Sequence, residues 1–150
     1  MKLTKTDLNK TLRVKPAEMD KQRKWYKVDA TNKTLWRLSV AISTKLLWKD
    51  KAYYSDFWDA WDFVVVENVE KIKVTGKKLQ QKIYYSYSWY KWNLKSINLN
   101  DLLKKNPVRA LQVAIRGMLS KNKLRDKRMK RCKIIKWPST KYDHFKPIKL

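Results

Sequence analysis

Four consecutive apolar residues, Phe63 to Val66, restrict the fold more than any other feature of the sequence. A strand that is apolar at every position has to be covered on both faces, as in a parallel sheet with crossover helices. A second strand is indicated at Trp25–Ala30, because aromatic and β-branched residues gather there before the turn-prone Thr31–Lys33. The two segments therefore predict neighbouring strands of a parallel sheet.

An amphipathic helix is predicted between these strands, from Thr34 to about Leu47. Its apolar residues recur at helical spacing while Arg37 and Lys45 fall away from that stripe. The stripe consists of Leu35, Leu38, Ile42 and Leu46. Strand, helix and strand in this order predict a right-handed βαβ unit.

The remaining elements are indicated by shorter patterns. We expect further strands at Lys71–Gly76 and Lys82–Tyr87, where apolar residues alternate or β-formers gather. A helix capped by Asn98 should end by Lys105, and a second helix should begin at Asn106 and Pro107 and end near Leu119. A last short strand is predicted at Lys133–Lys136.

Charge decides the class of partner. The chain has 37 Lys and Arg against 13 Asp and Glu, a formal net charge of +24, so its partner should be a polyanion. No apolar run approaches the roughly 20 residues of a spanning helix, and the amino terminus has no apolar signal core. We therefore expect a cytoplasmic nucleic-acid-binding protein without a membrane partner.

Few residues offer catalytic or metal chemistry. Cys132 and His144, the single cysteine and histidine, cannot form a disulfide or a four-ligand zinc site. The cations around Cys132 are expected to lower its thiol pKa, but neither residue has a partner for nucleophilic or general-base catalysis. Asp29 and Asp62 lie at strand ends, where capping or pairing with an Arg is favoured over catalysis. We expect no catalytic residues, no cofactor and no metal.

Two sets of cations are the candidate RNA-binding residues, because each neutralised phosphate releases counterions. The first set lies in the strongly basic stretch between residues 116 and 131 and consists of Lys121, Lys123, Lys127, Arg128 and Arg131. The second set lies at expected helix ends and loops and consists of Arg37, Lys49, Lys51, Lys77, Lys78, Lys95 and Arg116. For each one, the alternative is a solvated surface charge.

Four tyrosines leave two roles open. They could stack on unpaired bases, or they could be half-buried residues of a strand. They are Tyr84, Tyr85, Tyr87 and Tyr90.

Four stretches resemble the bacterial-type ribosomal protein L13 family of the large subunit. They are Trp25–Thr31 with Lys33–Leu35; Asp62–Val66; Lys71–Lys78; and Pro107–Leu111, leading to Ala114–Leu119 and Lys121–Leu124. The resemblance implies a three-layer α/β/α domain around a mainly parallel four-stranded sheet. It also implies a structural role on the cytoplasmic ribosome, with binding to large-subunit (23S-type) ribosomal RNA early in assembly and no catalysis.

The resemblance runs from about residue 23 to 138. We therefore expect a basic extended arm at 1–22, the α/β domain at 23–138 and a C-terminal tail at 139–150, broken by Pro138 and Pro147. The implied partners are the ribosomal RNA and neighbouring ribosomal proteins around a single copy of the chain, with messenger RNA as a further candidate.

Two other functions would also account for the positive charge. A free regulator of RNA or DNA would bind through the same cations and differ only in its partner. A small nuclease or RNA-modifying enzyme is disfavoured, because the sequence lacks a phosphate loop, a cofactor-binding glycine motif and a pair of histidines.

The sequence departs from the family pattern at six tryptophans that stand where the family has glycine. The chain has eight Trp and only two Gly, against a usual glycine content of about 7%. The six are Trp36, Trp48, Trp61, Trp89, Trp92 and Trp137. Overpacking costs roughly 1 to 3 kcal/mol per site, so six would rival a whole folding free energy of about 5 to 15 kcal/mol. We hypothesise that UGA codons encode glycine here; the alternative is a divergent protein whose aromatics stack on bases or fill gaps.

Overall fold

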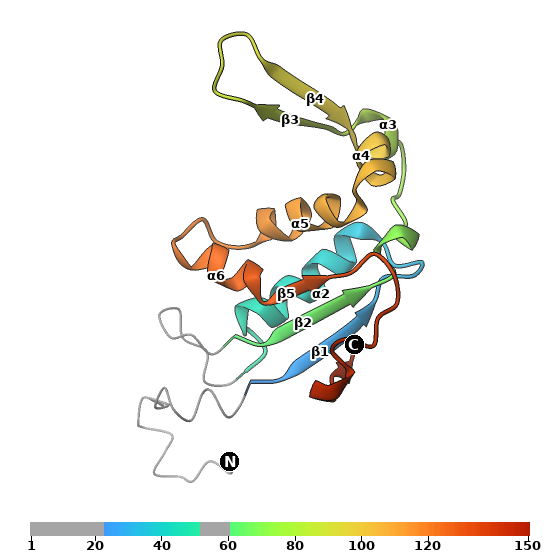
Figure 1. The fold of residues 1–150 in the computed structure, drawn as a ribbon, viewed down its shortest axis with the longest axis vertical. Coiled ribbons are helices and arrows are strands. Elements are labelled where there is room, and N and C mark those ends of the chain that lie inside the picture. The colour runs from blue at the N-terminus through green and yellow to red at the C-terminus, as the bar shows by residue number, and fades with distance from the viewer. Residues whose placement is uncertain (1–22, 52–60) are drawn as a thin grey trace.

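The computed structural model describes residues 23–51 and 61–150 (Figure 1). The arm predicted for 1–22 lies outside the described residues. In chain order the elements are β1 (Trp25–Asp29), α2 (Leu35–Leu47), β2 (Phe63–Glu67), the 3-10 turn η1 (Val69–Lys71), α3 (Lys78–Gln81), β3 (Ile83–Tyr87), β4 (Leu94–Asn98), α4 (Leu99–Lys105), α5 (Pro107–Met118), α6 (Leu124–Lys130), β5 (Cys132–Ile134), the 3-10 turn η2 (Asp143–Phe145) and β6 (Ile148–Lys149).

The main sheet has four strands in the order β5-β2-β1-β6, and every neighbouring pair is parallel. β1 and β2 pair over their full length, from Trp25 opposite Phe63 to Asp29 opposite Glu67, with α2 between them in the chain. The predicted strand–helix–strand order and the α/β class with a parallel four-stranded sheet are confirmed.

Alternate residues of the two central strands point to opposite faces of the sheet. On one face, Tyr26, Val28, Val64 and Val66 join the main apolar core with buried residues of α2 and α5. The stripe predicted for α2 supplies Leu38, Ile42 and Leu46 to this core. Burial on this face explains why the helix is amphipathic.

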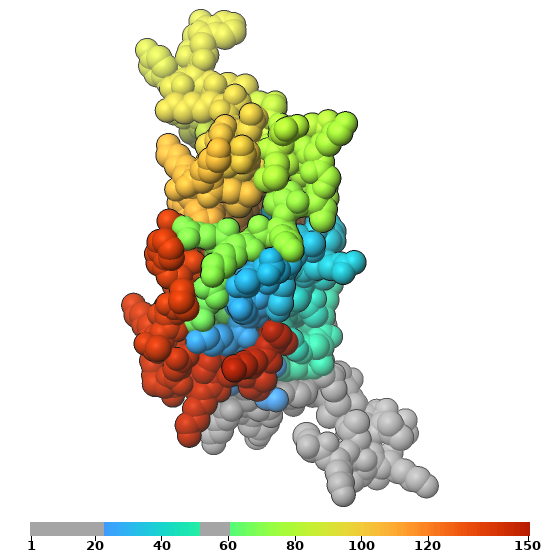
Figure 2. All heavy atoms as spheres, turned by 90° about the vertical axis from the view of Figure 1, so that its right-hand side faces the viewer, coloured from blue at the N-terminus to red at the C-terminus, as the bar shows by residue number. Residues whose placement is uncertain are grey.

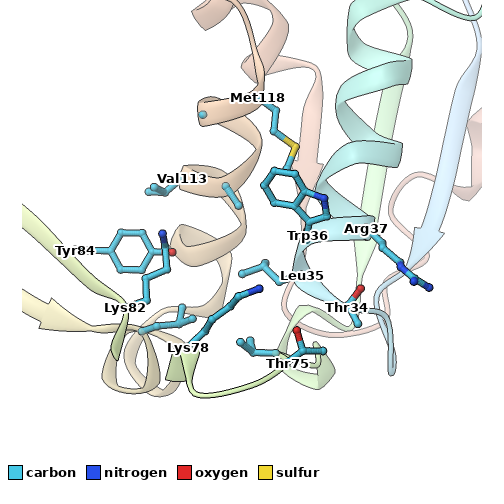
Figure 3. Close-up of a pocket in the computed structure, with 14 residues that line it drawn as sticks. Thr34, Leu35, Trp36, Arg37, Thr75, Lys78, Lys82, Tyr84, Val113 and Met118 are labelled. Carbon is cyan, nitrogen blue, oxygen red and sulfur yellow. The ribbon is translucent and has the colours of Figure 1, made fainter. Parts of the chain in front are cut away.

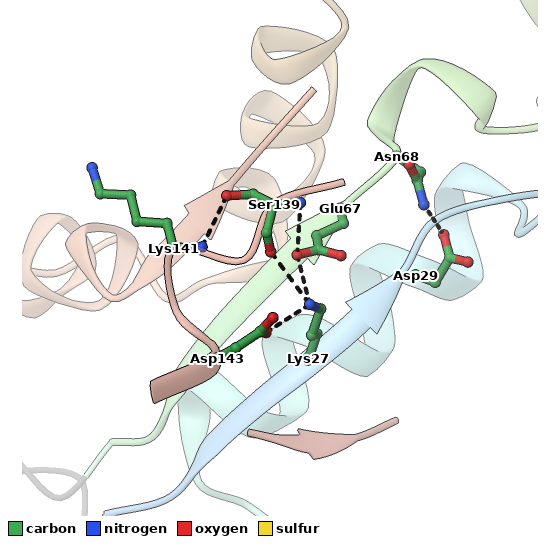
Figure 4. A network of polar contacts seen from close by, with 7 residues as sticks. All are labelled: Lys27, Asp29, Glu67, Asn68, Ser139, Lys141 and Asp143. Atoms are coloured by element: carbon green, nitrogen blue, oxygen red, sulfur yellow. Dashed lines mark hydrogen bonds and ion pairs between the residues drawn. The ribbon is translucent and has the colours of Figure 1, made fainter. Parts of the chain in front are cut away.

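The other face of the sheet is covered by the C-terminal segment. The Trp25 ring stacks on Phe63 at 4.4 Å and on Phe145 of η2 at 4.0 Å between centroids. Beside them the Lys27 ammonium lies 2.9 Å from both Glu67 and Asp143 (Figure 4). The hydrogen bonds with Asp143 and Glu67 raise the pKa of Lys27. With helices on one face and this segment on the other, the arrangement is consistent with three layers.

The segment assigned to a tail by sequence also supplies a strand. β6 pairs with β1 in parallel, with Tyr26 opposite Ile148, so it forms one edge of the sheet. Pro147 lies directly before this strand, at a position where its missing amide does not interrupt the pairing.

A separate antiparallel hairpin is formed by β3, β4 and the loop 88–93. It projects beyond α3 and α4 at the far end of the molecule (Figures 1 and 2). Its base rests on a small apolar cluster of Leu99, Leu102 and Ala110, joined by Tyr84 and Ile97 from the hairpin itself. The strand predicted at 82–87 is therefore present, but outside the main sheet.

Some predicted boundaries were wrong. Residues 71–76 form no strand; they contain only the bridge of Lys73 to Thr34. Their alternation arises because Ile72 and Val74 pack on the two apolar clusters. β4 was not predicted, and β5 begins at Cys132, one residue before the predicted strand.

Three tryptophans lie in the left-handed backbone region: Trp48 and Trp89 and Trp92, with φ of 64°, 63° and 63°. This backbone conformation costs a residue other than glycine roughly 1 to 2 kcal/mol of conformational free energy, whereas glycine adopts it without that cost. All three belong to the six positions at which the sequence suggested glycine.

Candidate nucleic-acid interface

A hollow lined mainly by cations lies between α5, α6 and β5; we call it the basic groove. It has a volume of about 880 Å³. Its cationic lining consists of Arg109, Arg116, Lys130 and Lys133, with Asp126 as its one carboxylate. Four cations against one carboxylate give this groove a net positive lining, which favours an anionic ligand.

Helix α5 positions two of these cations through its register. It starts as predicted, with Pro107 in its first turn and the Asn106 side chain accepting a hydrogen bond of 3.1 Å from the Arg109 amide. Ala110, Leu111 and Ile115 are buried, so Arg109 and Arg116 fall on the exposed side. Residues seven apart lie on one face of a helix, which directs both guanidinium groups into the groove.

One ion pair crosses the basic groove. The Arg116 guanidinium lies 3.6 Å from the Asp126 carboxylate, and both side chains are more than half exposed. Such exposed pairs contribute about 0 to 1 kcal/mol. A phosphate can therefore displace Asp126 from Arg116 at little cost.

Nine of the twelve candidate cations are exposed. Arg116 lines the basic groove, Lys121 and Lys123 lie on the turn between α5 and α6, and Lys127 lies on α6. Arg37 and Lys78 line a second groove, described below. Lys49, Lys77 and Lys95 are exposed outside both grooves.

The other three candidates contact partners within the protein. Lys51 lies 2.6 Å from the fully buried carboxylate of Asp62, and burial lowers the pKa of Lys51. Arg128 is only 2% exposed and lies over the Trp61 ring at 4.5 Å. Arg131 donates a hydrogen bond of 2.6 Å to the Trp61 carbonyl. These three side chains stabilise the end of the sheet and are not part of the groove.

Sequence reasoning missed Arg109, Lys130 and Lys133. The available signal was the helical register of α5, since Arg109 lies opposite the buried stripe. For Lys130 and Lys133 no local pattern exists, because their approach to α5 depends on how α6 and β5 fold back.

The four tyrosines differ in how far they are buried. Tyr84 is half-buried in the apolar cluster at the hairpin base, and burial raises its pKa. Tyr85, Tyr87 and Tyr90 are 65%, 49% and 75% exposed. Stacking on bases stays a prediction for all four, since even Tyr84 is still partly exposed.

The expected lowering of the Cys132 pKa was wrong. The thiol is buried in the core, and this burial raises its pKa to about 12, although Lys133 acts in the opposite direction. A thiol with this pKa is protonated at neutral pH, so Cys132 is a packing residue.

The two aspartates at strand ends have structural partners. Asp29 accepts hydrogen bonds from Asn68 and from the amide and hydroxyl of Thr31, which lower its pKa to about 2 (Figure 4). Asp62 accepts from the Lys24 amide as well as from Lys51. Both therefore fix the chain around the sheet, Asp29 as a turn cap and Asp62 in an ion pair.

Residues 23–51 and 61–150 contain neither a cluster of metal ligands nor a membrane-spanning helix. Within these ranges, no three His, Cys, Asp or Glu residues lie where they could hold a metal ion. None of the described helices is long and apolar enough to cross a membrane.

Comparison with known proteins gives a consistent result. The family model for ribosomal protein L13 matches residues 23–136. The large ribosomal subunit protein uL13 of Aquifex aeolicus (strain VF5) is 44% identical over 138 residues, 92% of this chain and 94% of that protein. The uL13 of Thermotoga petrophila is 41% identical over 140 residues, 93% of each chain. The uL13 of Methylococcus capsulatus is 42% identical over 138 residues, 92% of this chain and 96% of that protein.

Proposed function

The chain belongs to the ribosomal protein L13 family, and on that premise we propose that it binds large-subunit (23S-type) ribosomal RNA as a structural constituent, acting early in subunit assembly. As a large-subunit ribosomal protein it is located on cytoplasmic ribosomes. Its role there is architectural, without catalysis, and a single copy contacts the RNA and neighbouring ribosomal proteins. Messenger RNA is a secondary candidate partner.

The basic groove is the observation that supports RNA binding best. Its four cations come from three elements and face one hollow, so they can contact successive phosphates of one RNA segment. Exposed Lys121 and Lys123 on the turn before α6, and Lys127 on α6 itself, add positive charge to this part of the chain. Contacts of this kind position a protein on the RNA backbone, which suits an architectural role.

The test is the salt dependence of binding to the large-subunit ribosomal RNA of the source organism. Neutralising the groove with Arg109→Gln, Lys130→Gln and Lys133→Gln should reduce the slope of log affinity against log salt. Each lost phosphate contact accounts for about 0.7 to 0.9 of that slope, so three lost contacts should reduce it by about 2 to 3.

The matched control removes three exposed cations outside both grooves. It combines Lys104→Gln, Lys105→Gln and Lys141→Gln, which change the net charge equally. An equal loss of slope in this control would show that net charge, and not the groove, binds the RNA.

Membership of the particle is tested in the source cells. The chain should cosediment with large subunits after a high-salt wash and should already be present in early precursor particles. Its absence from complete subunits would favour the free RNA- or DNA-binding regulator, and presence only in late particles would contradict an early role.

A further inference from the structure

A second hollow lies beside α5, between the start of α2, α3 and the base of the hairpin; we call it the hairpin groove (Figure 3). Its volume is about 810 Å³. Leu35, Val74, Leu99 and Val113 supply apolar lining, and the half-buried ring of Tyr84 forms part of the hairpin side. Unlike the basic groove, it therefore offers extensive apolar and aromatic surface.

The charged side chains that line the hairpin groove are all positive. Arg37, Lys78 and Lys82 line it, and its lining contains no carboxylate. The Lys82 ammonium lies 5.4 Å from the centre of the Tyr84 ring, so a cation and an aromatic face lie side by side. An occupant has to combine negative charge with a flat apolar surface.

An RNA nucleotide has this combination, but only when its base is unpaired. In an A-form duplex the base faces are stacked and the major groove is too narrow for side chains. We propose that the hairpin groove receives an unpaired segment of RNA, with a base against the apolar lining and Tyr84 and its phosphates toward Arg37, Lys78 and Lys82. This rests on the proposed RNA-binding function and assigns the two grooves different tasks: the basic groove contacts backbone, and the hairpin groove contacts bases.

Gly117 permits a test that fills the hairpin groove. It lies on α5 in the groove lining, and a Cβ added there meets no atom within 4 Å. Gly117→Phe should place a ring in the hollow. Phe and Ala both have a higher helix propensity than Gly, so neither replacement should weaken α5. Gly117→Ala is the matched control, since it changes the helix in the same way but leaves the hollow open.

The probes are a fluorescein-labelled single-stranded RNA octamer of mixed sequence and the duplex of the same sequence, titrated with the full chain. We expect Gly117→Phe to weaken octamer binding about tenfold and to leave duplex binding unchanged, with Gly117→Ala close to the parent chain. Lys78→Glu with Lys82→Glu should weaken octamer binding more than Lys104→Glu with Lys105→Glu.

Other outcomes contradict the proposal in distinguishable ways. If neither RNA binds the parent chain, the RNA-binding function itself fails. If both RNAs bind and Gly117→Phe has no effect, only the groove assignment fails. If that variant binds both RNAs normally but no longer enters large subunits, the occupant is a neighbouring protein.

An independent observation concerns the three tryptophans in the left-handed region. At the end of α2, the Trp48 amide donates to the Lys45 carbonyl and the Lys49 amide to the Thr44 carbonyl, at 3.2 and 3.4 Å. These two bonds define a Schellman motif with Trp48 at the position that glycine usually occupies. In the hairpin loop, the Asn93 amide donates to the Tyr90 carbonyl, so Trp92 is the third residue of a tight turn, where a positive φ again favours glycine.

We infer that glycine occupies positions 48, 89 and 92 in the protein that the source cell makes, because its ribosomes read UGA as glycine. Trp89 and Trp92 are 91% and 90% exposed, so little packing requires an indole at either site. If position 36 is glycine as well, the hairpin groove is wider, since the Trp36 side chain is part of its lining.

Peptide mass spectrometry of the protein from source-cell ribosomes tests this inference. Glycine is expected at positions 48, 89 and 92, and tryptophan at any of them would overturn it for that position. Trp25 is the internal control: it lies in β1 outside the left-handed region and stacks on Phe63, so it should be read as tryptophan.

Discussion

The parallel sheet and the β3–β4 hairpin differ in what surrounds their side chains. In β2, every residue from Val64 to Glu67 is buried, whereas in β3 every residue except Tyr84 is exposed. A two-stranded hairpin is at best marginally stable alone, so this one depends on the cluster beneath it. Packing in the interior therefore restricts the side chains of the sheet, whereas the exposed side chains of the hairpin are available for contacts with other molecules.

The largest expected difference is between two leucines. Leu111→Ala in α5 should lower the free energy of unfolding by about 2 to 5 kcal/mol, because Leu111 is fully buried in the main core. Leu94→Ala in β4 should change it by less than about 0.5 kcal/mol, because Leu94 is 63% exposed. Urea unfolding measures both, and comparable losses would break the contrast between the two regions.

The next effect concerns strain in the hairpin loop. In a chain made with tryptophan at position 92, Trp92→Gly should raise the free energy of unfolding by about 1 kcal/mol, because glycine tolerates the left-handed backbone. Trp92→Ala removes the same ring but keeps a Cβ, so it should give no comparable gain. Thermal unfolding of the pair separates strain from loss of the indole, and equal midpoints would argue against strain.

Two helix starts sharpen the comparison further. Asn106→Ala should cost about 1 kcal/mol, since the Asn106 side chain accepts a hydrogen bond from the Arg109 amide. Asn98 lies where the hairpin joins α4 and makes no side-chain cap bond, so Asn98→Ala should cost much less. A larger loss for Asn98 in urea unfolding would show that the hairpin junction is more tightly held than its contacts indicate.

The smallest effect depends on pH. The pKa of Asp29 is about 2 in the folded chain, below its ordinary 3.8, so its contribution is present above pH 4 and is lost as pH falls toward 2. Because Asp29 is exposed, we expect less than about 1 kcal/mol. Asp29→Asn should flatten the acid limb of the curve of unfolding free energy against pH.

Residues 83–98 contain no carboxylate, so hydrogen exchange in the hairpin should follow this titration less closely than exchange in β1.

Sequence patterns predicted the elements whose side chains meet the interior. α2 and α5 have apolar residues at helical spacing, β1 has aromatic and β-branched residues, and β2 has an unbroken apolar run. The start of α5 has a cap and a proline as well. β6 was missed because it has two residues and is held by a distant strand rather than by its own composition.

The positive charge of the candidate interface was predictable from the sequence, but the residues that line the basic groove were not. A count of cations cannot separate Arg116, which lines the basic groove, from Arg128, which is buried over Trp61. Both lie in the same basic stretch, and only the turn of α6 against the sheet distinguishes them. The left-handed backbone at Trp48 could be suspected from sequence only through the family's glycine pattern.

The pairing of β1 with β6 has a kinetic consequence. It joins Tyr26 and Ile148, near the two ends of the described chain, so it is the most sequence-distant strand pairing in the sheet. Contacts between residues so far apart pay a large loop-closure entropy and tend to form late. Until then, β1 presents an open edge to other chains. A newly made copy is therefore most prone to aggregate in the interval before β6 closes that edge.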